Sequence, residues 1–383
     1  MTRPTQAPGR SLRTPQGYTA FVPDPLPPKL EWTPVLTRAL SDADRLIGQL
    51  AGEGGQLPNP HVLIRPFVRR EAVLSSRIEG TRATLGELLA VEAGVPVERS
   101  PDDLREVANY VKALEQGVKR LKTLPLSLRL MRELHAMLMA GVRGERAIPG
   151  EFRRSQNWIG PPGCTLANAS YVPPPVEAMT KCLGAWERFL HDRSLPPLAQ
   201  VALLHYQFEA IHPFLDGNGR VGRLLITLFL VEREILPTPL LYLSAFFEAA
   251  RRDYYERLQG VTEQGDWEGW LQYFLNGVAR QSEDALGRAA KINQLLAAWR
   301  KAAAEASSKV PLRLVDTLAA NPYLTLTGAA RQLKVAFTTV QRAAERLQKL
   351  GIVKEVSGQQ RNRVYCATAL LSILEAPAQL SPN

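Results

Sequence analysis

A glycine-rich turn that runs into an apolar stretch constrains this chain most. Residues 212–223 read HPFLDGNGRVGR, and residues 224–230 continue as LLITLFL, which predicts a buried helix. A glycine turn at the start of a helix leaves backbone N–H groups free and directs the positive end of the helix dipole at whatever lies above it. The turn therefore predicts an anion site, and phosphate is the usual anion at such a site.

The side chains of this turn favour chemistry over packing. Arg220 and Arg223 lie three residues apart on one helix face, where each guanidinium can bind phosphate oxygens through two N–H groups. His212 can act as a base near neutral pH, and Asp216 offers an oxygen ligand that suits Mg²⁺. The turn is not a Walker P-loop, because no Gly-Lys-Ser/Thr is present. The combination of a base, a carboxylate and two arginines predicts a site that handles phosphate.

This stretch resembles the HPFxDGNGRxxR signature of the Fic family and matches it at every fixed position. The resemblance implies a mainly α fold with a Fic-type helical core and a β-hairpin flap. It implies transfer of AMP from ATP, with Mg²⁺ on Asp216, to a Ser, Thr or Tyr hydroxyl of a target protein and of the chain itself. His212 would be the catalytic base, and the Asn218 side chain would help to cradle the phosphates. The residues expected to bind the nucleotide here are Asp216, Gly217, Asn218, Gly219, Arg220, Val221, Gly222 and Arg223.

A second motif lies before the core. Ser75 and Glu79 are four residues apart on one face of a predicted helix that Gly80 ends, which alone would be an ordinary exposed pair. Beside a Fic-like core, the three residues resemble the inhibitory motif (S/T)xxxE(G/N) in the N-terminal position of class II members. The resemblance implies that Glu79 pairs with Arg223, takes the place of a γ-phosphate oxygen and holds the enzyme inactive. In some relatives the glutamate also positions a water that removes AMP, and the sequence leaves that alternative open.

Residues 148–175 combine β-forming and turn residues, which predicts a hairpin. The plain interpretation is a surface excursion, whereas the resemblance implies the flap that overhangs the Fic active site. A hairpin edge can align a target segment by adding a strand. The residues expected to line the nucleotide side of the flap are Ala169, Ser170, Tyr171 and Val172.

Three further side chains stand out on predicted helices. Tyr254 and Tyr255 are adjacent, and paired tyrosines on a helix are most often core residues, but the resemblance implies that they lie against the adenine. His135 lies on an apolar stripe between residues 127 and 139. That stripe predicts a structural histidine in place of a ligand.

Residues 309–383 differ in character from the rest of the chain. Three helices and two short strands, at 352–356 and 363–366, resemble a small winged helix-turn-helix domain. Winged helices bind DNA, and they also dock proteins or form homodimers, so these alternatives stay open with equal weight. The residues expected to contact DNA, if it is the partner, are Thr338, Thr339, Gln341, Arg342, Arg361 and Arg363.

The length of 383 residues predicts several domains. We expect an N-terminal region with the inhibitory helix at 1–100, a catalytic core at 101–280, a connecting helix at 281–308 and the winged helix at 309–383. Residues 1–30 are rich in proline and predict an extended arm that is not a folded element.

Composition limits the class of protein. Three widely spaced cysteines predict neither a disulfide framework nor a zinc site and fit a reducing cytoplasm. No signal peptide or membrane span is expected, because no apolar run approaches about 20 residues. The net charge of +10 fits contact with a polyanion, either ATP or nucleic acid. A DNA-binding transcriptional regulator that senses ATP is therefore the alternative function.

Overall fold

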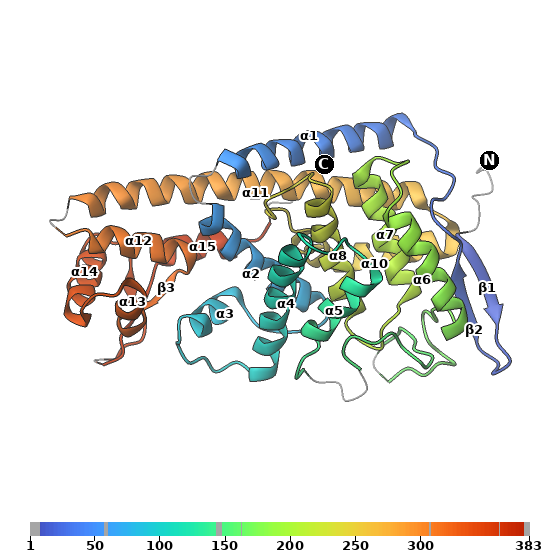
Figure 1. Cartoon of the computed structure of the whole chain (residues 1–383), viewed down its shortest axis with the longest axis horizontal. Helices are drawn as coiled ribbons and strands as arrows, with labels where there is room; N and C mark the ends of the chain where they lie inside the picture. The colour runs from blue at the N-terminus through green and yellow to red at the C-terminus, as the bar shows by residue number, and fades with distance from the viewer. Residues whose placement is uncertain are drawn as a thin grey trace.

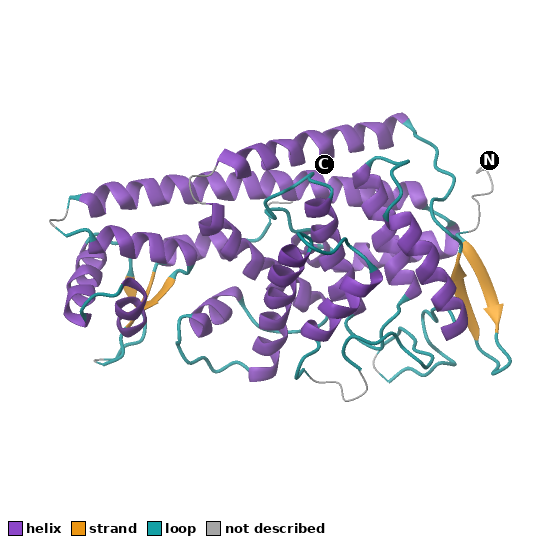
Figure 2. Ribbon diagram, viewed as in Figure 1, coloured by secondary structure: helices purple, strands orange, loops and turns teal. Residues whose placement is uncertain are grey.

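The computed structural model describes residues 8–56, 60–142, 148–161, 163–305, 308–359 and 361–378. The described chain is mainly helical, with two small antiparallel sheets (Figures 1 and 2). The elements up to the motif helix are β1 (Gly9–Arg13), β2 (Thr19–Pro23), α1 (Pro34–Gln56), α2 (Pro60–Ile78), α3 (Leu85–Glu92), α4 (Pro101–Arg120), α5 (Leu128–Leu138), α6 (Val176–Leu190), α7 (Pro197–Ile211) and α8 (Asn218–Glu232). The remaining elements are α9 (Ser244–Ala249), α10 (Arg251–Gln264), α11 (Trp267–Ala304), α12 (Val310–Ala320), β3 (Tyr323–Thr325), α13 (Leu326–Leu333), α14 (Phe337–Lys349), β4 (Lys354–Glu355), β5 (Val364–Cys366) and α15 (Thr368–Glu375).

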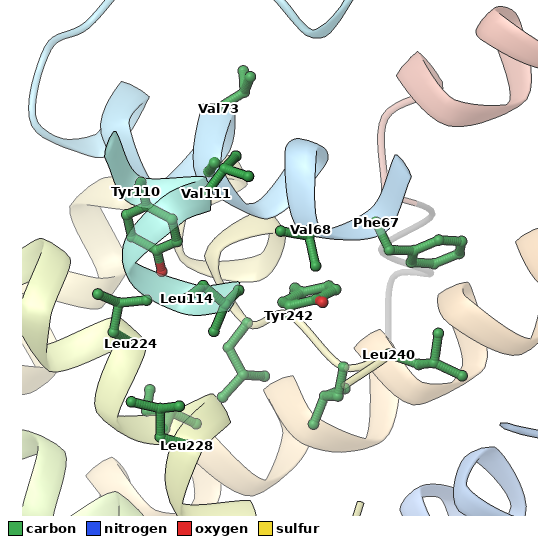
Figure 3. Packing of buried hydrophobic residues seen from close by; sticks show 14 of the residues in the cluster. Phe67, Val68, Val73, Tyr110, Val111, Leu114, Leu224, Leu228, Leu240 and Tyr242 are labelled. Carbon is green, nitrogen blue, oxygen red and sulfur yellow. The ribbon is translucent and has the colours of Figure 1, made fainter. Parts of the chain in front are cut away.

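The apolar helix α8 lies at the centre of the core, as its sequence predicts. It is buried along almost its whole length and packs against α2, α4, α5 and α7. Figure 3 shows Leu224 and Leu228 of α8 beside Tyr110 and Leu114 of α4. A Cβ on Gly117 of α4 would lie 2.9 Å from Leu228 Cδ2, so this glycine lets the two helices approach closely. The start of α8 is thereby fixed by a packed interior.

Helix α2 joins the core to the C-terminal part of the chain. It packs against α4, α8 and α9 on one side and against α12 and α15 on the other. Its buried Glu71 accepts hydrogen bonds from Tyr110 Oη, at 3.0 Å, and from the hydroxyl of Ser244 in α9. These contacts fix α2 to α4 and α9, so the position of its last turn is set by the core.

The prediction of an unfolded arm over residues 1–30 is wrong for residues 9–23. Strands β1 and β2 pair antiparallel, with Gly9 opposite Pro23. Ala20 and Val22, two residues apart on the same face of β2, are buried against α6 and α7. The high proline content of residues 1–30 hid this short apolar pattern. Phe21 N also donates to Val172 O at 2.9 Å, so this hairpin supports the segment predicted as the flap.

The C-terminal part has one strand and one helix more than the sequence predicts. Its three-stranded sheet has the order β3–β5–β4, with all pairs antiparallel. The unpredicted strand β3 is only three residues long and precedes α13, and the unpredicted helix α15 follows β5. Leu370 and Leu374 of α15 are buried, so this helix belongs to the packed structure.

The predicted boundary at residues 280–281 falls inside one continuous helix, α11, of 38 residues. The composition changes there from aromatic to rich in Ala, Lys and Arg, but no proline breaks the helix. Helix α1 lies along α11, as Figure 1 shows at the upper edge of the molecule. None of the described helices is both long and apolar enough to cross a membrane.

Candidate nucleotide site

The glycine turn is a rigid corner between α7 and α8. Helix α7 ends at Ile211, and His212 follows it with left-handed backbone angles (φ 49°, ψ 60°). Helix α8 begins after Gly217 (φ 77°). A Cβ on Gly217 would lie 2.9 Å from Met139 Sδ, so both the angle and the space require glycine. The first N–H groups of α8 follow directly, which is the geometry of an anion site.

His135 holds this corner in place, as its position on an apolar stripe predicts. Gly150 N donates to Nδ1 at 2.9 Å, so Nε2 carries the proton and donates to Asp216 O at 3.0 Å. The ring stacks on Phe214 with 3.8 Å between centroids. Burial lowers the pKa of His135 to about 4, which keeps the ring neutral.

The Asn218 side chain corrects one expectation. Its Oδ1 accepts from Phe214 N at 2.8 Å and its Nδ2 donates to Phe214 O at 2.9 Å. The buried amide therefore closes the turn from inside and does not face a phosphate. The backbone N–H of Asn218, in the first turn of α8, is its group suited to an anion.

His212 is half-buried and has the form that a general base needs. Its Nδ1 lies 3.3 Å from the carbonyl oxygen of Glu209, which can only accept, so Nδ1 carries the proton and Nε2 is left basic. Burial lowers the pKa of His212 to about 4, so the imidazole is neutral at pH 7. The His212 carbonyl accepts from Arg153 Nε at 3.0 Å and Asn157 Nδ2 at 3.4 Å. These two residues fix the left-handed backbone, and no local sequence signal predicts their role.

The contact expected between Glu79 and Arg223 is present. Arg223 Nη2 donates to Glu79 Oε1 at 2.6 Å and to Ser75 O at 3.0 Å, while Arg223 Nε donates to Ser75 Oγ at 2.8 Å. The Arg223 side chain is 2% exposed and that of Glu79 is 34% exposed. Solvent therefore reaches the pair only from the side of the Glu79 carboxylate. Burial raises the pKa of Glu79, but the charge and hydrogen bond of Arg223 offset this and hold the pKa below its ordinary value.

Glu79 also covers the start of α8. A Cβ added to Gly219 would overlap Glu79 Oε1. The carboxylate therefore lies directly over the first turn of the helix, where the free N–H groups and the helix dipole favour an anion. Gly80 ends the motif with φ 100°, a conformation that favours glycine.

Arg220 and Asp216 lie on the other side of the turn. Arg220 is buried, and its Nη1 and Nη2 lie 3.5 Å from Glu106 Oε2 and 3.7 Å from Asp216 Oδ1. Asp216 Oδ1 also accepts from Gly217 N at 2.6 Å, and its side chain is 54% exposed. No group of three or more His, Cys, Asp and Glu side chains that could hold a metal occurs among the described residues. An exposed carboxylate beside an anion site fits Mg²⁺ that takes its other ligands from phosphates and water.

Glu209 is a member of the site that the motif does not include. Its carboxyl lies over Gly222, where an added Cβ would overlap Oε1, and no donor among the described residues reaches that buried oxygen. Burial raises the pKa of Glu209 to about 8, so the carboxyl is protonated at pH 7. An acidic residue inside the apolar sequence of α7 is the signal that could have found it.

The flap prediction is wrong in form. Residues 148–175 contain a single antiparallel bridge between Ile159 and Tyr171, with N···O distances of 2.9 and 3.0 Å, and no paired strands among the described residues. Pro161 and Pro173 flank the bridge and cannot donate to a ladder. Tyr171 Oη donates to Ala210 O at 2.6 Å, so this side chain fixes the segment to the end of α7. Ala169, Ser170 and Val172 flank it.

Only one of the two tyrosines is accessible. Tyr254 is 1% exposed and donates to His205 Nε2 at 2.9 Å, and His205 Nδ1 in turn donates to Gly222 O at 3.0 Å. Tyr254 is thus a core residue that supports α8, which corrects its expected contact with adenine. Tyr255 is 42% exposed, with its ring 5.2 Å from that of Tyr254, and remains suited to contact a base.

The residues named for DNA contact lie in α14 and in the segment between β4 and β5. Thr338, Arg342 and Arg361 are exposed, and Thr339, Gln341 and Arg363 are partly buried. Gln341 Nε2 donates to Glu345 Oε1 at 3.1 Å, so its amide is already engaged within α14. Thr338 and Arg342, one turn apart, are the side chains of α14 best placed to meet a partner.

Comparisons with known proteins identify two segments. Residues 37–119 match the domain described as Fic/DOC family N-terminal, and residues 125–230 match the Fic/DOC family domain. The protein adenylyltransferase Fic of Drosophila virilis is 32% identical over 160 residues, which are 40% of this chain and 31% of that protein. The protein adenylyltransferase Fic of Drosophila persimilis is 31% identical over 160 residues, which are 29% of that protein. The chain thus matches less than a third of the length of these curated relatives.

Two solved structures share the fold. A Fic family protein from Desulfovibrio desulfuricans G20 has a TM-score of 0.60 at 21% identity and covers 89% of this chain and 98% of its own. Fic-1 from C. elegans has a TM-score of 0.51 at 21% identity and covers 67% of this chain and 75% of its own. By its matches to the family domains, the chain carries a Fic/DOC family domain at residues 125–230, preceded at residues 37–119 by the N-terminal domain of the same family.

Proposed function

We propose that this chain is a protein adenylyltransferase that moves AMP from ATP to a Ser, Thr or Tyr hydroxyl of a target protein and of itself. The observation that carries the proposal is the neutral His212, whose basic Nε2 lies at the corner that precedes the anion site of α8. The name of the matched Drosophila relatives, protein adenylyltransferase, supports the same reaction class.

The reaction needs one proton transfer and one exchange of bonds at phosphorus. His212 Nε2 takes the proton of the target hydroxyl, and the hydroxyl oxygen forms a bond to the α-phosphorus of ATP. The bond from that phosphorus to the oxygen bridging to the β-phosphate breaks, and pyrophosphate leaves with the electron pair. The tautomer set by the Glu209 carbonyl keeps Nε2 ready for this step.

The phosphates would be held by the start of α8. The N–H groups of its first turn, Arg220 and Arg223 supply donors and positive charge where negative charge develops. Asp216 would hold Mg²⁺, which would neutralise charge on the phosphate oxygens. Tyr255 is the exposed aromatic side chain placed to contact the adenine.

Glu79 would keep the enzyme inactive. Its carboxylate lies over Gly219, at the expected anion position, and accepts a hydrogen bond from the guanidinium of Arg223. A γ-phosphate would need both of these places. ATP can then bind in a productive alignment only after this pair opens. Because Glu79 keeps 34% exposure, it can also reach a water, and removal of AMP by the same glutamate is part of this proposal.

Position-specific labelling tests the reaction class. The Glu79→Gly variant is incubated with ATP labelled either at the α- or at the γ-phosphate, and protein-bound label is measured. We expect label from the α-phosphate only, and none in the double variant Glu79→Gly, His212→Ala. Retention of γ-label would mean that the site transfers phosphate and would overturn the proposal.

A second candidate concerns the C-terminal part. We propose that residues 309–378 form a winged helix that selects a partner through Thr338 and Arg342, which are exposed on α14. If the partner is DNA, the chain would be a regulator that senses ATP. An electrophoretic mobility shift with genomic DNA fragments, in wild type and Arg342→Ala, tests DNA binding by this part. An equal shift in both proteins would exclude α14 as the helix that recognises DNA.

A further inference from the structure

A cavity of about 300 Å³ lies away from the nucleotide site, between α2, α9 and α15. Its walls combine apolar side chains with one buried cation. Leu74 of α2, Ala249 of α9 and Pro377 supply accessible apolar surface. Charged groups also line the cavity: Arg70, Arg77, Glu248 and Glu375, of which Arg70 is the buried one. A volume of this size, with apolar walls and a few charged groups, is typical of a pocket for a small organic molecule.

Arg70 is short of negative partners. It is 9% exposed, and Asp284 Oδ2 lies 3.8 Å from its Nη1. That carboxylate is already engaged by Arg288, whose Nε and Nη2 donate to it at 2.6 and 2.9 Å. Two buried guanidiniums therefore share one carboxylate, and burial together with the charge of Arg288 lowers the pKa of Arg70 to about 10.

The other acidic side chains near Arg70 are committed elsewhere. Glu248 lies 3.5 Å from Arg77, and Glu375, at the rim of the cavity, accepts from Gly86 N at 2.9 Å. Glu71 accepts from Tyr110 and Ser244, and its burial raises its pKa. A buried cation without a full counter-charge is costly, so the cavity wall favours an incoming anion.

We propose that this cavity is an effector site for a small organic anion made of a carboxylate and an apolar chain. The carboxylate would lie on Arg70 through two N–H groups, and the chain would lie against Leu74, Ala249 and Pro377. Inorganic phosphate lacks the apolar part, and a neutral alcohol lacks the charge, so both should bind less well.

The site is linked to the motif of α2 by helix geometry. Arg70, Val73, Leu74 and Arg77 share one face of α2, and Ser75 and Glu79 lie on the opposite face, against Arg223. The coupling requires the ligand to bind more tightly when Glu79 lies on Arg223 than when that pair is open, and it then stabilises the position of α2 seen here. This coupling rests on the proposed function, whereas binding of the anion does not.

Calorimetric titration of the full chain with octanoate tests the site. We expect saturable binding that weakens at least tenfold in Arg70→Met, which keeps the apolar stem. Arg129→Met, on an arginine whose side chain is 74% exposed, should bind like wild type. Ala249 lies at the exposed rim of the cavity, so Ala249→Trp should block entry of octanoate without disturbing the core. This variant tests whether octanoate binds in the cavity if Arg70→Met does not fold.

Several results would overturn the site. These are no saturable binding of octanoate, equal affinity in a folded Arg70→Met or in Ala249→Trp, or binding of 1-octanol or inorganic phosphate as tight as that of octanoate. For the coupling, saturating octanoate should lower ATP affinity severalfold in wild type and leave it unchanged in Glu79→Gly. An unchanged affinity in wild type contradicts the coupling. If ATP binds to neither protein, the proposed function fails, while the octanoate titration still decides the site.

Discussion

Glu79 Oε1 lies 2.6 Å from Arg223 Nη2, although the two residues are 144 positions apart in the chain. The contact brings the end of α2 onto the start of α8 and places a carboxylate where a phosphate would bind. Because the guanidinium is buried and the carboxylate is one-third exposed, the pair can open only if α2 shifts or Glu79 turns toward solvent. The predictions that follow depend on this arrangement.

Two adjacent buried serines offer a matched pair of variants. Ser75 Oγ accepts from Arg223 Nε, whereas Ser76 Oγ is buried with no hydrogen-bond partner among the described residues. Ser75→Ala should raise self-labelling with AMP and lower the free energy of unfolding by about 1–2 kcal/mol, because it leaves a buried N–H unpaired. Ser76→Ala should change labelling little and leave stability equal or slightly higher. Equal labelling by both variants would contradict a role for Ser75 in holding Arg223.

The pKa of His212 sets the acid limb of the pH profile. A base with a pKa of about 4 is protonated, and so inactive, only below that value. Because the Glu79 charge raises the pKa of His212, its loss in Glu79→Gly lowers that pKa further. Transfer at saturating ATP should therefore rise with pH at or below about 4 and show no further His212 limb between pH 5 and 7. A limb near pH 6.5 would mean that His212 titrates as an exposed histidine.

His212→Ala separates catalysis from binding. Among the described residues, the imidazole hydrogen-bonds to the Glu209 carbonyl, and the donors for phosphate lie in α8. Transfer should fall by at least a hundredfold while the affinity for ATP changes less than about threefold. Calorimetric titration of Glu79→Gly with and without His212→Ala measures both, and lost ATP binding would make the histidine a structural residue.

Glu209 predicts an unusual pH dependence of stability. Its pKa is about 8 in the folded chain and near the ordinary 4.5 when unfolded, so the folded state binds more protons between these values. The wild-type chain should lose stability as pH rises from about 5 to 8, and Glu209→Gln should not show this contribution. At pH 8.5 the variant should be more stable than wild type by roughly 1–3 kcal/mol, and the difference should shrink toward pH 5. Chemical denaturation at both pH values measures it, and parallel curves would contradict a buried neutral Glu209.

The sequence allowed the centre of the fold to be predicted, because the required features are local. The glycine turn, the apolar run of α8 and the helix that ends at Ile211 follow from periodicity and backbone geometry. The partner of Arg223 followed from a resemblance and not from spacing, since no local rule relates positions 79 and 223. Burial of His135 followed from its place on an apolar stripe.

The features that were missed depend on tertiary contacts. Strands β1 and β3 are short, and each is stabilised by a partner strand that helix or strand propensity cannot locate. Asn218 and Tyr254 are polar residues that bond inward, to Phe214 and His205, and sequence alone cannot tell such a residue from one that faces a ligand. Glu209 was overlooked because the signature begins three residues later.

The Glu79→Gly variant tests the central claim most directly. After incubation with ATP and Mg²⁺, intact-mass analysis should find the mass of one or more AMP groups on Glu79→Gly and little on wild type. Glu98→Gly, which changes an exposed glutamate in the loop between α3 and α4, should behave like wild type. Equal modification of wild type and Glu79→Gly, or none on either protein in the presence of cell lysate, would contradict an adenylyltransferase that is restrained by the Glu79–Arg223 pair.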